Sequence, residues 1–410
     1  MINDVFFPAD ILIPEVEYPE KWSVIACDQF SSESDYWERV RANTGDEPSA
    51  LNMIIPEAYL DGINEDKAAE IICAAMNDYA GRGLFREIKD SFIYVERTLP
   101  DGHVRRGLVG AVDLDRYSFS GGSFDILASE GTLLDRLPAR IRVRRSALLE
   151  LPHIMAFIGD TDKIVIEPLS DKTDALPVLY DFDLMEGGGH IKGMQVQGNE
   201  ARAVISAMRA LREKSRPLMV IGDGNHSLAA AKVFWDELKQ NLNETERKHH
   251  PARLALLEIN NVYDPAITFE AIHRIVFGTD PAEFTSAFEK AMPKGVDYDF
   301  QWITGDRSGS IGLLADCIGG ALAVMQKFLD SYAADTGCRV DYIHGLDSVT
   351  RLAKDPGNVG LILPTMDKSE LFATVASGGV FPKKSFSVGH AKDKRYYLEC
   401  RAIRRGLAAL

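Results

Sequence analysis

The sequence predicts a mixed α/β fold, in which short apolar strands alternate with amphipathic helices. Residues 218–221 form a continuous apolar run of strand length, and apolar side chains then recur at helical spacing between Leu228 and Leu242. A second helical pattern begins after Asn64. The turn signal Pro100-Asp101-Gly102 lies between two further apolar runs, which predicts an antiparallel hairpin and therefore a mixed sheet.

The composition is that of a globular protein with more than one domain. The chain has 410 residues, and this length indicates about two or three domains. Hydrophobic residues make up 46% and charged residues 26%, so the chain can bury a large core. We expect residues 1–278 to form an N-terminal α/β region and residues 279–410 a C-terminal α/β region.

Charge, cysteine usage and hydropathy exclude several classes of protein. A formal net charge of −15 argues against a nucleic-acid partner, because binding to nucleic-acid phosphates requires clustered Lys and Arg. The five cysteines contain no Cys-x-x-Cys pair, so neither a disulfide framework nor a zinc site is indicated. No signal peptide is visible at the N-terminus, and the apolar stretch 311–325 is too short to cross a membrane. These features favour a cytoplasmic protein without a membrane partner.

The first strand and helix expected along the chain enclose an acidic residue. Residues 23–28 are interpreted as a strand that ends at Asp28, and a helix follows through Tyr36 and Trp37. A carboxylate at the end of a strand suits a functional site, and it suits a helix cap equally well.

A run of arginines stands out in the otherwise acidic chain. Planar guanidinium groups favour paired contacts with phosphate oxygens, so the run is a candidate phosphate site. A solvated helix face that makes surface ion pairs is the alternative. The five arginines lie within ten residues and are Arg136, Arg140, Arg142, Arg144 and Arg145.

The switch from strand to helix at residues 222–227 is the most informative stretch. Gly222 and Gly224 permit a tight turn and close approach by a ligand, and the following first helical turn offers amides and a positive dipole end. Asp223 and His226 add a carboxylate and an imidazole, which indicate chemistry on a phosphoryl or nucleotide group. The alternative is an ordinary turn in which Asp223 caps the helix.

The same turn carries a resemblance to a known family. Asp223-Gly224-Asn225-His226, followed by Ala229-Ala230, resembles the Asp-Gly-His-His-Arg strand–turn–helix motif of the ParB/sulfiredoxin-like superfamily, in particular domain-of-unknown-function family 1015. Asn225 stands where the first His is usual, and Ser227 where an Arg that contacts phosphate is usual. The resemblance implies a ParB/sulfiredoxin-like core around residues 218–242 and another cation in place of the missing arginine.

Weaker matches follow in the family's order along the chain. Their residues are Glu130, Thr132 and Arg140, then His273 and Arg274, and finally Pro382, Lys384 and Ser385. The resemblance implies that Glu130 shares the catalytic work with Asp223 and His226. It also implies phosphate or nucleotide binding by the other residues of the site, which are Gly222, Gly224, Asn225, Ser227, Thr132, Arg136, Arg140, His273, Arg274, Lys384 and Ser385.

Relatives with known activity include free-serine kinases, so the resemblance implies nucleotide-dependent phosphoryl transfer or phosphate hydrolysis. The acceptor would be a small hydroxylated metabolite such as serine or phosphoserine, with ATP or ADP and Mg²⁺ as cofactors. Asp223 or Glu130 would accept the hydroxyl proton or position magnesium, and His226 would orient a phosphate. The alternative is a nucleotide-binding switch or ligand-gated interaction protein without turnover.

Overall fold

The computed structural model describes residues 4–31, 33–59, 63–132, 134, 137–305, 307–377 and 380–404. These residues divide into two compact units. Unit 1 comprises residues 1–127, 132–267 and 391–410, and unit 2 comprises residues 128–131 and 268–390. The chain therefore leaves unit 1 and returns to it, whereas the sequence suggested one division near residue 278, which lies inside the range of unit 2.

Unit 1 is built on an eleven-stranded mixed sheet with the order β5-β6-β11-β8-β12-β4-β3-β10-β9, to which β1 and β2 add at β4 and β3. Strand β12 runs parallel to β8, whereas β11 runs antiparallel to β8 and β12 antiparallel to β4. The expected mixed α/β class is thereby confirmed. The strands are β1 (Phe6–Phe7), β2 (Ala9–Pro14), β3 (Phe85–Thr98), β4 (Val104–Asp113), β5 (Tyr117–Ser118), β6 (Ile126–Ala128), β8 (Met155–Ile158), β9 (Val178–Leu184), β10 (Gly189–Val196), β11 (Met219–Asp223) and β12 (Leu254–Asn261).

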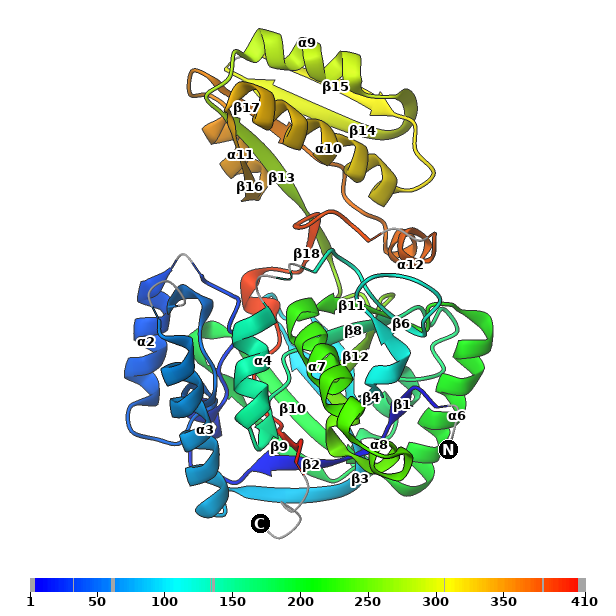
Figure 1. Cartoon of the computed structure of the whole chain (residues 1–410). Helices are drawn as coiled ribbons and strands as arrows, with labels where there is room; N and C mark the ends of the chain where they lie inside the picture. The colour runs from blue at the N-terminus through cyan, green and yellow to red at the C-terminus, as the bar shows by residue number, and fades with distance from the viewer. Residues whose placement is uncertain are drawn as a thin grey trace. The chain divides into compact units, whose positions relative to one another are not determined.

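The helices of unit 1 include both that the apolar spacing predicts. The helix expected after Asn64 is α3, and the Asn64 side chain caps it by accepting a hydrogen bond from the Lys67 amide at 3.1 Å. Helices α3, α4 and α7 lie side by side in Figure 1. The helices are α1 (Pro19–Trp22), α2 (Ser34–Thr44), α3 (Glu65–Gly81), α4 (Leu137–Ser146), α5 (Glu167–Ser170), α6 (Gly198–Lys214), α7 (Asn225–Leu238) and α8 (Glu244–His249).

The returning C-terminal segment is buried in unit 1. Strands β7 (Leu149–Glu150) and β19 (Arg401–Ala402) form a small separate sheet. Arg395 Nε lies 2.9 Å from a carboxylate oxygen of Glu258, and Arg401 Nε lies 2.7 Å from one of Glu150. All four side chains are buried, so the segment supplies charges that the interior of unit 1 requires.

The strand expected over residues 23–28 is wrong. These residues form only an isolated bridge between Ile25 and Tyr396, because their backbone partners belong to the irregular returning segment. The Tyr397 amide donates to the Val24 carbonyl at 2.7 Å, and the Ala26 amide donates to the Arg395 carbonyl at 3.0 Å. Asp28 is nevertheless held in place by this pairing.

Unit 2 has a six-stranded sheet with the order β15-β14-β17-β13-β16, and β18 adds to β13. Its strands are β13 (Phe269–Phe277), β14 (Lys294–Thr304), β15 (Arg307–Leu313), β16 (Arg339–His344), β17 (Asn358–Ile362) and β18 (Phe386–Val388). Its helices are α9 (Pro281–Ala291), α10 (Ile318–Thr336), α11 (Leu346–Leu352) and α12 (Lys368–Ala376). No helix within the described part of the chain is long and apolar enough to cross a membrane.

Candidate functional site

The turn between β11 and α7 packs too closely for side chains at its two glycines. A Cβ atom on Gly222 would lie 2.1 Å from the Phe157 ring. Gly224 has a φ of +75°, and a Cβ there would lie 3.0 Å from the Cα of Ile154. The turn is therefore restricted to glycine on steric and conformational grounds, and this places Asp223 at the start of α7.

Some amides of this turn already have partners inside the protein. The Gly224 amide donates to Asp223 Oδ1 at 3.0 Å, and the Ser227 amide donates to the Gly224 carbonyl at 3.0 Å. An anion at this helix end would therefore rely on side chains and the helix dipole as well as on the backbone.

A buried imidazole that the sequence did not single out lies beside this helix end. His153 Nε2 lies 3.4 Å from Ser227 Oγ, and His153 Nδ1 lies 2.8 Å from the Tyr397 hydroxyl. His153 and Tyr397 are 4% and 3% exposed. Burial lowers the pKa of His153 below its ordinary value of 6.5, and the negative charges of Asp28 and Asp223 offset this effect only in part. The ring is therefore neutral at pH 7 and can accept a proton.

Two carboxylates and a lysine complete the cluster around His153. Lys394 Nζ lies 3.5 Å from Asp223 Oδ2, which accepts no hydrogen bond from the described residues. Burial raises the pKa of Asp223, and the charge of Asp28 adds to this while Lys394 opposes it. Burial also disfavours the charged form of Asp28. The pKa of Asp28 is nevertheless held below its ordinary value by the positive charge of His153 in its protonated form, by a hydrogen bond from Gln29, and by the charges of Lys394 and Arg140.

The two acids are therefore tuned in opposite directions by their surroundings. Pairs of titratable groups whose surroundings push their pKa values apart are common in acid–base sites. We name the group formed by Asp28, His153, Asp223, Lys394 and Tyr397 the acid–imidazole cluster.

Two of the predicted arginines, Arg140 and Arg144, reach this region. Arg140 on α4 lines the same cavity as His153 and Ser227, and it is paired with Glu57. Arg140 and Ser227, which stands where the family motif has its arginine, thus line the same cavity. The neighbouring Arg142 and Arg145 pair with the exposed acids Asp66 and Glu237, as surface ion pairs do.

The other residues predicted in unit 1 are dispersed around the turn. Asn225 and His226 lie in the first turn of α7 and are half-buried. The Thr132 hydroxyl is buried and has no hydrogen-bond partner among the described residues. Arg136 lies outside the described residues.

A separate group of predicted residues lies in unit 2. The Glu130 carboxylate accepts hydrogen bonds from the Lys384 and Ser385 amides, both at 3.3 Å. Arg274 is fully buried, and one of its nitrogens donates to the Lys384 carbonyl at 3.0 Å. His273 accepts from the Leu363 amide at 3.2 Å through Nδ1. The structure thus gathers these five residues with one another.

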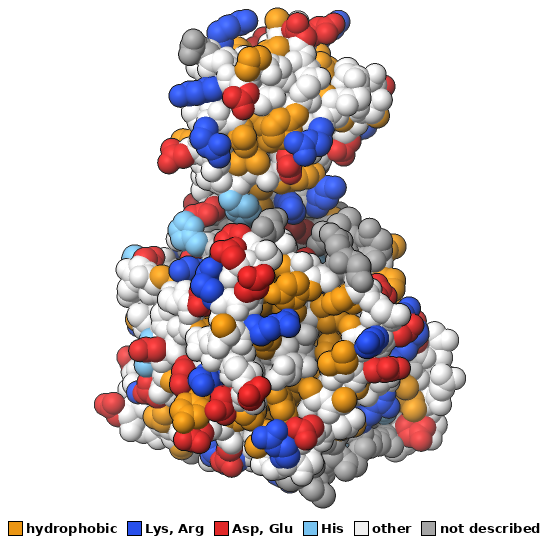
Figure 2. Space-filling view, turned by 90° about the vertical axis from the view of Figure 1, so that its left-hand side faces the viewer, with side chains coloured by type: hydrophobic (Ala, Val, Ile, Leu, Met, Phe, Trp, Pro, Cys, Tyr) orange, Lys and Arg blue, Asp and Glu red, His pale blue; other side chains and the backbone are white. Residues whose placement is uncertain are grey.

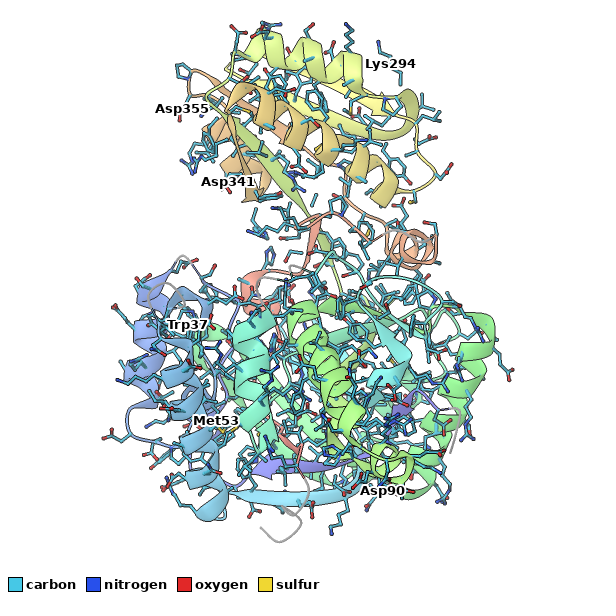
Figure 3. All side chains as sticks on the ribbon, viewed as in Figure 1. Trp37, Met53, Asp90, Lys294, Asp341 and Asp355 are labelled. Atoms are coloured by element: carbon cyan, nitrogen blue, oxygen red, sulfur yellow. The ribbon has the colours of Figure 1, made fainter. Side chains whose placement is uncertain are left out.

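The cavity beside the acid–imidazole cluster has a volume of about 170 Å³. It lies between α3, α4, the 3₁₀ turn Ala50–Met53 and the first turns of α7, and Met53 is labelled in Figure 3. Its described lining consists of Cys27, Met53, Ile54, Ile55, Ile72, Met76, Ala139, Arg140, Val143, Arg144, Ala147, Leu149, Glu150, Leu151, His153, Ser227, Ala230 and Tyr397. The turn between β11 and α7 therefore borders a hollow that is partly open to solvent.

Among the described residues, no group of three His, Cys, Asp or Glu side chains is arranged to hold a metal ion. The carboxylate of Asp223 in the turn and the carboxylate of Asp28 influence each other electrostatically. Mg²⁺ in phosphoryl-transfer sites commonly uses one or two carboxylates together with substrate phosphates, so this pair fits such an ion.

The fold and the cluster define a two-unit α/β protein with a group of ionisable side chains beside a helix N-terminus. The chain belongs to the family described as protein of unknown function DUF1015, whose model matches residues 13–399. No curated protein matches the sequence.

Three solved structures illustrate the range of similar proteins. A free serine kinase variant in complex with AMP has 13% identity and a TM-score of 0.37, and the match covers 72% of this chain and 90% of that one. A conserved hypothetical protein from Pyrococcus furiosus has 15% identity and a TM-score of 0.34, with 70% and 93% covered. SbnI with a C-terminal truncation from Staphylococcus aureus has 11% identity and a TM-score of 0.36, with 68% and 82% covered.

Proposed function

We propose that unit 1 transfers the terminal phosphoryl group of ATP or ADP to the hydroxyl group of a small metabolite. The observation that carries this proposal is the acid–imidazole cluster, which joins Asp223 at the start of α7 to a buried neutral imidazole and a lysine. A helix end that only bound phosphate would need neither a carboxylate of raised pKa nor a neutral base beside it.

In this scheme the acceptor oxygen forms a bond to the terminal phosphorus, and the bond from that phosphorus to the bridging oxygen breaks. The hydroxyl proton passes to Asp223, whose raised pKa suits a general base. The nucleotide leaves one phosphate shorter. Lys394 and Arg140 are the cations that offset the charge developing on the phosphoryl oxygens.

The remaining predicted roles stay part of the proposal. His226 orients a phosphate. In addition to the predicted roles, Asp28 would hold Mg²⁺ beside the base Asp223, and the ion would neutralise charge on the nucleotide phosphates. Glu130 stays a candidate catalytic residue. Thr132, His273, Arg274, Lys384 and Ser385 stay candidate phosphate ligands, and serine or phosphoserine stays the acceptor class implied by the resemblance.

The test is incubation of the protein with ATP or ADP and Mg²⁺ in the presence of a panel of hydroxy amino acids and other small hydroxylated metabolites. We expect acceptor-dependent formation of the shortened nucleotide and of a phosphorylated product. Nucleotide binding without turnover on any acceptor would contradict the proposal and favour a nucleotide-binding switch.

A further inference from the structure

The cavity beside the acid–imidazole cluster is larger and more apolar than a serine side chain requires. Most of its described lining is aliphatic or thioether, and α3, α4 and the 3₁₀ turn Ala50–Met53 contribute these side chains. The apolar members are Met53, Ile54, Ile55, Ile72, Met76, Ala139, Val143, Ala147, Leu149, Leu151 and Ala230.

The polar side chains on its wall fall into three sets, of which the first is Arg140 with its partner Glu57. Arg144 and Glu150 lie 2.5 Å apart, and Glu150 also lies 2.7 Å from Arg401, so this set of two arginines and one glutamate carries one net positive charge. His153 and Ser227 contact each other and belong to the proposed reaction centre. A ligand in the cavity therefore meets reactive polar groups at one patch and hydrocarbon over most of the remaining wall.

The size of the space indicates what fits. A cavity of about 150 Å³ lined by aliphatic and aromatic side chains accommodates benzene in a well-studied engineered protein, and the volume here is about 170 Å³. The CH₂OH group of serine would leave most of this space empty, whereas a branched-alkyl or phenyl group would fill it.

The surroundings of this cavity are also apolar. Ile54, Ile55 and Ile72 line a second, wider hollow as well as the cavity, so these side chains form a wall between the two. Apolar side chains gather on the face of unit 1 that carries α2 and α3 (Figure 2). The exposed Ile71 on α3 belongs to the lining of the wider hollow.

We propose that the cavity binds the apolar body of the phosphoryl acceptor, which is a hydroxy compound carrying a hydrocarbon group of about five or six carbons. Its hydroxyl group lies beside Ser227, in the turn that also carries the proposed base Asp223, and its hydrocarbon group packs against Met53, Ile72 and Val143. This inference rests on the proposed phosphoryl transfer, and it replaces serine by a bulkier apolar alcohol as the substrate class.

Binding of simple alcohols tests the inference without requiring turnover. Primary alcohols from propanol to octanol, together with 2-phenylethanol, are titrated into the full-length protein and followed by ligand-observed NMR. We expect affinity to rise about fourfold for each added methylene up to five or six carbons and then to fall. Equal affinities across the series would overturn the inference.

A cavity-filling substitution provides the second arm of the test. Ala139→Leu adds three carbons to the cavity wall from α4, and Ala210→Leu makes the same change on the exposed face of α6. We expect Ala139→Leu to weaken hexanol binding at least tenfold, and Ala210→Leu to leave it unchanged. If Ala139→Leu weakens ADP binding by the same factor as hexanol binding, the cavity holds the nucleoside and the inference is wrong.

A variant that enlarges the cavity keeps the test decisive if Ala139→Leu does not fold. Met53→Ala should move the best-bound alcohol to a longer chain, and an unchanged optimum would contradict the inference. The two proposals also fail separately. Chain-length-dependent binding without any phosphoryl transfer would refute the proposed reaction alone, whereas phosphoryl transfer to serine with a flat alcohol series would refute the substrate class alone.

Discussion

Among single residues, His153 is central to the proposed site, and sequence patterns could not identify it. His153 lies in an apolar segment before β8, and its partner Tyr397 is 244 residues away in the sequence. No local spacing connects the two residues, and a lone histidine in such a segment is ordinary core composition. Asp223 was identifiable because its motif is local, since the strand, the glycines and the helix all lie within 25 residues.

The lowered pKa of His153 predicts a specific pH dependence of stability. The unfolded chain binds a proton on this residue below about pH 6.5, whereas the folded protein binds it only at lower pH. The stability of the fold should therefore fall as the pH drops below 6.5, until the folded pKa is reached. Urea titrations between pH 5 and 8 measure this slope. His153→Gln removes the titrating group, and an unchanged slope in this variant would assign the effect to other residues.

Asp223 should matter far more to catalysis than to stability. Asp223→Asn keeps the acceptor oxygen for the Gly224 amide but removes the charge beside Lys394. We expect turnover to fall by roughly 100-fold or more, with a melting temperature close to that of the parent. Asp162→Asn is a matched control, because Asp162 makes only an exposed ion pair with Lys214 among the described contacts. Full turnover in Asp223→Asn would reduce Asp223 to a turn residue and direct attention to Asp28 or Glu130.

At the scale of elements, the β11–α7 turn sets the position of the cluster. Its strand and helix followed from the apolar periodicity, and its glycines from the need for a tight turn. Two properties did not follow from the sequence. The Ser227 amide is already occupied, and the helix end faces a cavity whose walls come from α3, α4 and Ala50–Met53. Such packing partners depend on tertiary arrangement and leave no local pattern.

The tight packing of this turn predicts unequal effects for two glycine substitutions. In Gly222→Ala the new methyl group collides with the Phe157 ring, so we expect a loss of about 1–3 kcal/mol in unfolding free energy. In Gly81→Ala at the end of α3 nothing lies within 4 Å of the new atom, and a gain of about 0.4–1 kcal/mol is expected. Urea denaturation of both variants measures the difference, and equal stabilities would mean that the turn is not sterically constrained.

At the scale of the whole molecule, the returning C-terminal segment could not be predicted from the sequence. Residues 395–401 alternate like an ordinary final strand, and the partners of Arg395 and Arg401 lie more than 130 residues earlier. The two ends of segment 268–390 lie next to each other, since the Gly389 amide donates to the Thr268 carbonyl at 2.9 Å. Unit 2 residues 268–390 thus form an insertion between the parts of unit 1.

This organisation predicts opposite outcomes for two shortened chains. Replacement of residues 268–390 by a short Gly/Ser linker retains Arg395 and Arg401 and should give one cooperative unfolding transition. A chain that ends at residue 278 leaves the buried Glu258 without Arg395, at a cost of about 3–5 kcal/mol, and leaves Glu150 with Arg144 as its remaining ion-pair partner among the described contacts. The cost is comparable to the total stability of a domain, so this chain should not fold. Thermal melts followed by circular dichroism distinguish the two, and a folded 1–278 chain would contradict the assignment of the C-terminal segment to unit 1.

The central claim is that the start of α7 in unit 1 holds the phosphates of a nucleotide beside the acid–imidazole cluster. A crystal structure of the full-length protein grown with ADP and Mg²⁺ tests this most directly. The account predicts a phosphate group within hydrogen-bonding distance of the backbone of residues 224–227 or of the Ser227 hydroxyl group. A nucleotide bound elsewhere, with the turn left empty, would contradict it.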